Sequence, residues 1–142
     1  MTSVRDAMTP GVQAASTMHS LADAAVMMKE NDVGSVPVVD EGHLVGIVTD
    51  RDIVLRVAEG VDPKKVTVGE AASRDLVTVE ADQNLDDALH LMAAHQVRRL
   101  PVVEGGRLVG MLAQADVALI AKEKQAGEML EGISEPSSAA RA

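Results

Sequence analysis

The sequence predicts an α+β fold in which two copies of one unit, each a short β-sheet with two helices, pack with pseudo-twofold symmetry. Three observations lead to this prediction. An internal repeat spans most of the 142 residues. Each copy shows helical and strand periodicities in the same order. One copy of about 60 residues is marginal for burying a core by itself, whereas two packed copies are not.

The internal repeat has a constant offset of 64 residues, the distance from Ser35 to Arg99. The stretch SVPVVDEGHLVGIVTDRDIVL (35–55) aligns without a gap with RLPVVEGGRLVGMLAQADVAL (99–119). The same register pairs Val4 with Val68. Because the register holds across helical, strand and turn patterns alike, we interpret the repeat as a duplication.

Each copy begins with a short predicted strand and an amphipathic helix. The strands are expected near Val12–Ala15 and Leu76–Glu80. Ser20 and Asn84 then provide good N-caps for the helices. Apolar residues follow at i, i+3, i+4 and i+7, which predicts one apolar stripe on each helix. These residues are Leu21, Ala24, Ala25 and Met28 in the first copy and Leu85, Ala88, Leu89 and Met92 in the second.

A hairpin and a second helix complete each copy. Apolar runs at 36–39 and 44–48 flank a turn that contains glycine, and 100–103 and 108–112 repeat this pattern. Such a pattern predicts a β-hairpin. The second helix is expected to begin near Thr49 in the first copy and near Gln114 in the second.

These patterns divide the chain into a first domain (1–60), a linker (61–67, part of the linker-like stretch 59–67), a second domain (68–121) and a C-terminal tail (122–142). The tail ends in Ser, Ala and Pro, and we expect it to be partly disordered. Met129, Leu130 and Ile133 have the spacing of a short amphipathic turn. Docking of this turn on the body or on a partner is the alternative.

The composition excludes several classes of protein. A net charge of −9 argues against binding nucleic acid or an anionic membrane surface. The absence of Cys excludes disulfides and thiolate chemistry. No signal peptide and no apolar run of about 20 residues is recognisable, so we expect a soluble cytoplasmic protein. With no Phe, Trp or Tyr, the core must be aliphatic, and eight Met residues can fill its gaps.

The repeated motif strongly resembles the second half of a CBS domain, named for cystathionine β-synthase. It reads VPVVDEGHLVGIVTDRDIV in the first copy and HQVRRLPVVEGGRLVGMLAQADV in the second. The resemblance covers roughly residues 4–120. It implies a CBS pair, or Bateman module, that binds adenosine-containing ligands in the cleft between the copies. It also implies a homodimer.

The resemblance implies a ribose- and phosphate-binding pattern, Gly-x-x-Thr/Ser-x-x-Asp, which is complete from Gly46 to Asp52. The Asp52 carboxylate can accept hydrogen bonds from two ribose hydroxyls. Thr49 and the free N–H groups of a helix start suit a phosphate, and Arg51 would add charge. The same Thr-x-x-Asp spacing is close to a helix capping box, and the two interpretations are compatible.

The second copy departs from this pattern. It keeps Asp116 but has Ala113 in place of the Thr, which puts a fully formed second site in doubt. Arg98 and Arg99 precede its Pro-Val-Val strand, a place where the family's basic residues often reach phosphates. A solvated edge, or pairing with local acids such as Glu104, is the alternative.

Together these residues give the hypothesis of a composite site. Ribose would bind Asp52, phosphate would bind near Thr49, and Arg98 or Arg99 of the other copy would contribute charge. By family position, Val12 and Val36 would lie against the adenine, although plain core packing explains each of them alone.

No metal site is expected, because the four His residues are scattered and lack an i, i+4 pair. No cofactor is required. A Mg²⁺ that accompanies a nucleotide would find Asp50 as the nearest spare carboxylate.

Three functions remain open at this stage. The first is a regulatory sensor that binds an adenine nucleotide (AMP, ADP, ATP or a related ligand) and signals to a separate, unknown protein. The second is a ligand-free dimeric scaffold or interaction module, which Ala113 favours. The third is an enzyme, which is disfavoured because no nucleophile–base set, metal cluster or phosphate loop is recognisable.

Overall fold

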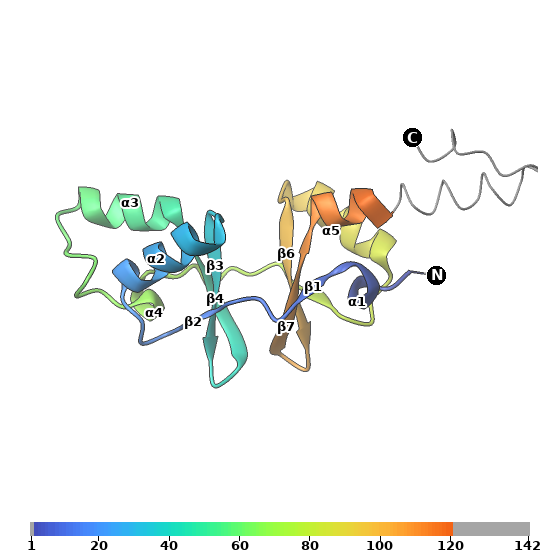
Figure 1. The fold of residues 1–142 in the computed structure, drawn as a ribbon, viewed down its shortest axis with the longest axis horizontal. Coiled ribbons are helices and arrows are strands. Elements are labelled where there is room, and N and C mark those ends of the chain that lie inside the picture. Colours follow the sequence, from blue (N-terminus) through green and yellow to red (C-terminus); the bar gives the residue numbers. More distant parts are fainter. Residues whose placement is uncertain (1, 121–142) are drawn as a thin grey trace, which may run out of the picture.

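The computed structural model describes residues 2–120. The predicted tail, 122–142, lies outside these residues. The fold is α+β, as expected, and its elements occur twice in the same order. Figure 1 shows two halves beside each other, with their strands in the middle of the molecule and most of their helices toward the outside.

Each half contains a three-stranded sheet and two longer helices. The first half holds β2 (Ala15–Ser16), α2 (Leu21–Asn31), β3 (Ser35–Asp40), β4 (His43–Thr49) and α3 (Asp50–Ala58). The second holds β5 (Val79–Glu80), α5 (Leu85–His95), β6 (Arg99–Glu104) and β7 (Arg107–Ala113). A helix then begins at residue 114 and reaches the end of the described part at 120.

The predicted caps of α2 and α5 are confirmed. The Ser20 side chain accepts a hydrogen bond from the Asp23 N–H at 3.0 Å. Asn84 Oδ1 accepts one from the Asp86 N–H at 3.0 Å. Three residues of each predicted apolar stripe are buried: Leu21, Ala24 and Met28, and Leu85, Ala88 and Met92. Ala25, which we placed on the stripe, is exposed.

The hairpins form where the sequence predicts them. Glu41 and Gly42, the two turn residues of the first hairpin, both have positive φ, at 51° and 85°. This backbone matches the twist of paired antiparallel strands, and glycine adopts it without steric cost. The strands expected near residues 12–15 and 76–80 are shorter than predicted, with only two paired residues in each.

Hydrogen bonds join the strands of both halves into one sheet in the order β2-β3-β4-β7-β6-β5. β2 is parallel to β3, β5 is parallel to β6, and each hairpin is antiparallel. The halves meet where the hairpin tips pair. There the Leu44 N–H donates to the Gly106 carbonyl at 3.0 Å, and the Leu108 N–H donates to the Gly42 carbonyl at 3.1 Å.

The two halves exchange their N-terminal segments, which the sequence did not reveal. α1 (Val4–Ala7) and β1 (Thr9–Pro10) pack on the second half, and β1 pairs with β7. α4 (Val68–Ala71), which follows the linker, packs on the first half. Val4 and Val68, which correspond in the repeat, are both fully buried, each in the core of the other copy. The exchange therefore ties the two copies together.

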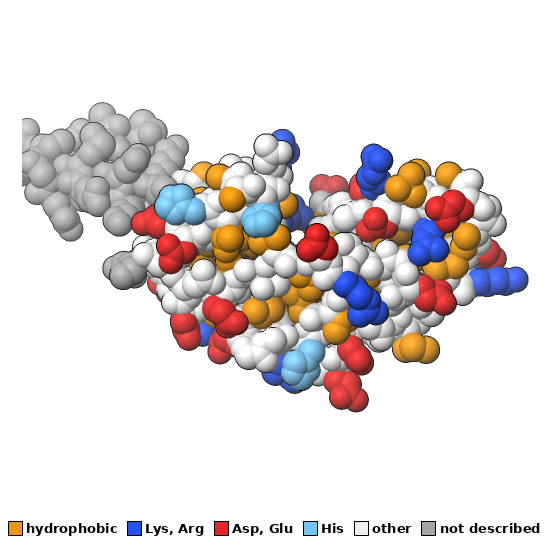
Figure 2. Space-filling view, turned by 180° about the vertical axis from the view of Figure 1, so that it is seen from behind, with side chains coloured by type: hydrophobic (Ala, Val, Ile, Leu, Met, Phe, Trp, Pro, Cys, Tyr) orange, Lys and Arg blue, Asp and Glu red, His pale blue; other side chains and the backbone are white. Residues whose placement is uncertain are grey.

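The surface of the described part carries its negative charge on both halves. Figure 2 shows acidic side chains distributed over the whole face and hydrophobic side chains exposed on both halves and between them.

Candidate functional site

A pocket of about 570 Å³ lies between the two halves. This volume falls within the range of small-molecule sites. The segment 9–13 crosses from one half to the other and forms one wall. The end of α2 and the start of β3 supply the first half's share, and β6, β7 and the following helix supply the second's. Because the exchanged N-terminal segment is part of the wall, the pocket depends on the exchange.

The structure brings four of the eight predicted site residues into the lining of this pocket: Val12, Val36, Arg99 and Asp116. The other four, Thr49, Arg51, Asp52 and Arg98, are not part of that lining. In the repeat register, Thr49, Arg51 and Asp52 correspond to Ala113, Ala115 and Asp116. Val12, Val36, Arg99 and Asp116 therefore lie in this pocket, whereas Thr49, Arg51 and Asp52 lie at the corresponding positions of the first half, which we call the equivalent place in the other half.

Asp116 is half-buried in the first turn of the helix that begins at residue 114. Its Oδ2 accepts a long hydrogen bond, 3.5 Å, from the Thr9 hydroxyl of the exchanged segment. Ala113 has no hydroxyl to accept the Asp116 N–H, and among residues 2–120 its own N–H makes no hydrogen bond to the Asp116 carboxylate, so this carboxylate is not part of a capping box. Its oxygens retain lone pairs that can accept hydrogen bonds from a ligand.

Asp52 makes different contacts, and the capping interpretation of its motif is confirmed. The Thr49 N–H donates to Asp52 Oδ2 at 2.9 Å, and the Asp52 N–H donates to Thr49 Oγ1 at 3.1 Å. This reciprocal pair is a capping box at the start of α3. One carboxylate oxygen therefore already accepts a hydrogen bond within the protein.

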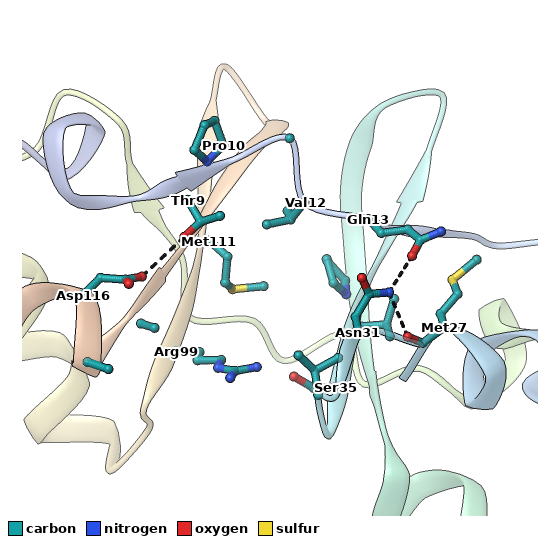
Figure 3. Close-up of a pocket in the computed structure, with 16 residues that line it drawn as sticks. Thr9, Pro10, Val12, Gln13, Met27, Asn31, Ser35, Arg99, Met111 and Asp116 are labelled. Carbon is teal, nitrogen blue, oxygen red and sulfur yellow. Dashed lines mark hydrogen bonds between the residues drawn. The ribbon is translucent and has the colours of Figure 1, made fainter. Parts of the chain in front are cut away.

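Arg99 lines the pocket with its positive charge unpaired among residues 2–120. Among the described residues neither Arg98 nor Arg99 pairs with Glu104, which binds Arg5 at 2.7 Å instead. Figure 3 shows the Arg99 guanidinium extending toward Ser35 of the other half. Arg98 is exposed, and its carbonyl accepts the Gln114 N–H at 2.8 Å.

Sequence reasoning missed several residues of the lining, including Thr9, Gln13, Asn31, Ser35 and Met111. Thr9 and Gln13 lie on the exchanged segment, whose position depends on tertiary packing. Met111 directly follows Gly110 of the repeated motif. Its place next to that motif could have indicated that it lies near the site.

Within residues 2–120, no cluster of three or more His, Cys, Asp or Glu side chains is arranged to hold a metal ion. Among the same residues, no helix has the length and apolar character needed to cross a membrane. Among the described residues that line the pocket, Arg99 and Asp116 carry the formal charges.

Comparisons with known proteins find matches over nearly the whole chain. A family model for the CBS domain matches residues 4–59 and 68–123. The CBS domain-containing protein YhcV of Bacillus subtilis is 43% identical over 136 residues, covering 94% of this chain and 96% of its own. Hypoxic response protein 1 of Mycobacterium tuberculosis is 38% identical over 138 residues, 96% of each chain.

Solved structures agree with these matches. Hypoxic Response Protein I, solved with two coordinated zinc ions, has a TM-score of 0.76 and 41% identity, covering 84% of this chain and 99% of its own. CBSX2, solved in complex with AMP, has a TM-score of 0.75 and 30% identity, covering 87% of this chain and 98% of its own.

Proposed function

Because this chain belongs to the CBS-domain family, as a tandem pair of CBS domains, we propose that it is a regulatory module that binds an adenosine-containing ligand between its two domains. AMP, ADP, ATP or a related ligand would occupy the pocket, and a separate protein would respond to the change. The AMP complex of CBSX2 supports this proposal. The observation that carries it is the arrangement of Asp116 and Arg99 around one pocket.

The two charged residues suit the two polar parts of a nucleotide. A carboxylate can accept hydrogen bonds from both ribose hydroxyls at once, and Asp116 has the lone pairs to do so. A guanidinium matches a phosphate in geometry and charge, and Arg99 has no competing carboxylate among the described residues. Val12 and Val36 offer aliphatic surface to the base, as the chain has no aromatic side chain to stack on it.

The equivalent place in the first half is a second candidate position. Thr49 and the start of α3 would bind phosphate there, Asp52 would bind ribose with its remaining oxygen, and Arg51 would add charge. Arg98, a second cation just before β6, would attract the phosphates from outside the pocket. No resident cofactor is required, and any Mg²⁺ would arrive with the nucleotide, near Asp50.

We also propose that two copies of the chain associate through α3. The nine-residue helix α3 has no buried residue, and Val54, Leu55 and Val57 are 64%, 47% and 49% exposed. Leu119, the repeat counterpart of Leu55, is 59% exposed. The three exposed aliphatic residues on one short helix, of which Leu55 recurs as Leu119, suit an isologous contact between copies.

The alternative function is a ligand-free dimeric scaffold or protein-interaction module. Ala113, which removes the hydroxyl expected beside a phosphate, favours it. Neither proposed function includes catalysis.

Thermal unfolding with added ligands distinguishes the two functions. Circular dichroism is the probe, because the chain has no Trp or Tyr. A ligand at about 100 times its Kd stabilises the folded state by roughly 2.7 kcal/mol, which raises the midpoint by several degrees. AMP, ADP, ATP, NAD, S-adenosylmethionine and cyclic di-AMP form the panel.

Two variants locate the site. Asp116→Ala should abolish the shift if the ligand binds the described pocket. Asp52→Ala should lower the unligated midpoint, because the capping box is lost, yet keep most of the shift. If the ligand-induced rise in midpoint is lost only in Asp52→Ala, the ligand binds at the candidate position in the first half. No shift with any ligand would make the scaffold the leading function.

A further inference from the structure

A turn leads from the short strand to the long helix in each half, and two hydrogen bonds close it. In the first half the His19 N–H donates to the Ser16 carbonyl at 3.0 Å, and the Ser16 N–H donates to His19 Nδ1 at 2.9 Å. In the second half the Gln83 N–H donates to the Glu80 carbonyl at 3.1 Å, and the Glu80 N–H donates to Gln83 Oε1 at 2.9 Å. His19 and Gln83 correspond in the 64-residue register, so the two turns differ in the chemistry of this one acceptor.

Only the acceptor in the first turn can be lost by protonation. A ring nitrogen that accepts an N–H must carry a lone pair, so the neutral imidazole of His19 has its proton on Nε2. An imidazolium has a proton on both nitrogens and accepts no hydrogen bond. Histidine changes charge between pH 5 and 8, whereas the amide oxygen of Gln83 remains an acceptor throughout this range.

The first turn also holds α4, the exchanged helix that packs on the first half. The His19 carbonyl accepts the Val68 N–H at 2.7 Å, and the Thr17 carbonyl accepts the Gly69 N–H at 3.0 Å. Both N–H groups belong to the first turn of α4. The geometry of the turn at His19 therefore affects how firmly α4 is attached.

The second turn holds α1 in the same way. The Gln83 carbonyl accepts the Val4 N–H and the Ala81 carbonyl accepts the Arg5 N–H, both at 2.9 Å. The molecule therefore contains two matching attachments between its copies, one with a titratable acceptor in the turn and one without.

We propose that His19 makes the attachment of α4 to the first half weaken as the pH falls from about 7.5 to about 5.5, while the attachment of α1 to the second half does not respond. Protonation sets a ring N–H against the Ser16 N–H, so the ring must turn away and the turn loses one of its two closing bonds. Because the closed turn disfavours the protonated ring and the open turn does not, closure becomes less favourable as the pH falls.

The change would reach one candidate ligand position and spare the other. Ser73, two residues after α4, pairs with Ile47 of β4, the strand that ends at Thr49. Loosening of α4 therefore acts on the backbone beside the equivalent place in the other half. The described pocket has residues 9–13 as its wall, and these follow α1.

Charged groups on the elements packed around the turn are all exposed: Asp23 of α2, Asp40 of β3, Glu70 of α4, and Lys64 and Lys65 of the linker. Asp23 interacts electrostatically with His19 and opposes the proposed effect, because it attracts an imidazolium. Asp23 Oδ2 accepts the Ser20 N–H and Glu70 Oε2 accepts the Thr67 N–H in their own caps. Salt screens such exposed charges but does not replace the hydrogen bond to Ser16.

Amide hydrogen exchange of the full chain, followed by NMR in about 0.5 M NaCl, tests the inference. The protection factors of Val68 and Gly69 are compared with those of Val4 and Arg5 in the same molecule, at pH 7.5 and at pH 5.5. Protection factors already correct for the pH dependence of intrinsic exchange. The ratio of the first pair to the second should fall about three- to tenfold at pH 5.5, where only about one ordinary imidazole in ten is neutral.

Two exchanged residues provide matched variants. His19→Gln gives the first turn the acceptor that the second turn already uses, so the ratio should no longer change with pH. Gln83→His makes the reciprocal change, and the protection of Val4 and Arg5 should then fall at pH 5.5. Circular dichroism at pH 7.5 confirms that each variant is folded.

The inference is wrong if all four amides of wild type lose protection in parallel, or if His19→Gln keeps the wild-type response. A folded Gln83→His whose second half does not respond to pH would also contradict it, because the two turns make the same hydrogen bonds. No nucleotide enters the experiment, so its result is independent of the proposed function.

Discussion

Gly110 of β7 lies directly against Thr9 of the exchanged segment, and a Cβ atom on Gly110 would stand 2.8 Å from the Thr9 carbonyl oxygen. The same relationship recurs in the other half, where a Cβ on Gly46 would stand 2.9 Å from the Ser73 carbonyl oxygen. Side chains essentially never approach backbone oxygens so closely. Both Leu-Val-Gly motifs therefore need glycine, because only a residue without a Cβ atom allows the backbone of the exchanged segment to lie so close to the strand.

Gly110→Ala should destabilise the fold, because the added methyl group must push β1 away from β7. Overpacking of this kind costs about 1–3 kcal/mol. Thermal unfolding followed by circular dichroism measures the effect. Gly34→Ala is the control, since its new methyl group would meet only the side-chain carboxylate of Asp50, which can move. Equal midpoints for Gly110→Ala and wild type would show that the segment does not need this close approach.

Arg5→Met should loosen the exchanged N-terminal segment. Arg5 joins α1 to the second half through Asp82 at 3.0 Å and Glu104 at 2.7 Å. These ion pairs are exposed, so salt should screen them. We expect a lower unfolding midpoint than wild type at low ionic strength and a smaller difference at about 1 M NaCl. A difference that does not change with salt would show that Arg5 acts through packing of its aliphatic part.

Asp23 should make folding stability dependent on pH in the acidic range. Hydrogen bonds from Ser20, first from its backbone and then from its side chain, lower the pKa of the Asp23 carboxyl. A lowered folded-state pKa means that the stabilisation is fully present above the unfolded pKa, about 3.9, and is lost as pH falls toward the folded pKa. NMR titration of the Asp23 side-chain carbon should therefore give a midpoint below that of a model peptide.

Ser20→Ala tests the cause of this shift. The variant removes the hydrogen bond of the Ser20 hydroxyl to the Asp23 carboxylate and keeps the one from the Ser20 N–H, so the pKa of Asp23 should rise part of the way toward its usual value. An Asp23 midpoint that is unchanged in Ser20→Ala would contradict the contribution assigned to the hydroxyl.

Charged residues on α3 should prevent dimerisation. Val54→Lys combined with Val57→Lys places two like charges in the proposed contact between copies. We expect wild type to elute at twice the chain mass of 14.8 kDa and the variant at the single-chain mass, measured by light scattering after size exclusion. Met18→Lys is the control, because Met18 is 79% exposed but lies outside α3. If wild type elutes at the single-chain mass, the proposed contact through α3 is wrong.

Much of the fold was predictable because it depends on neighbours in the sequence. Ser20 and Asn84 act as caps through residues two or three positions away, and the hairpin turns contain the glycines that positive φ favours. The short helices α1 and α4 were not predicted, since four residues give too little periodicity to recognise. Ala25 was misplaced because small residues fit the apolar stripe and the exposed side of a helix equally well.

The candidate site was predictable only in part, because it combines residues from distant segments. Asp116 and Arg99 stand out in the sequence by motif and by charge. Thr9, Gln13 and Asn31 do not, because they enter the pocket through the exchange and through the position of the end of α2. Thr49 and Asp52, although they complete the motif, belong to the equivalent place in the other half.

The sequence by itself determined the duplication, the order of the longer helices and of the hairpins, and the family, because each follows from local pattern and from the 64-residue register. Only the tertiary structure decided which half each N-terminal segment packs on. The two copies offer nearly the same docking surface, so Val4 and Val68 fit either half by pattern alone. Packing of the whole chain determines which half each segment contacts. It thereby also places residues 9–13 where they form a wall of the pocket.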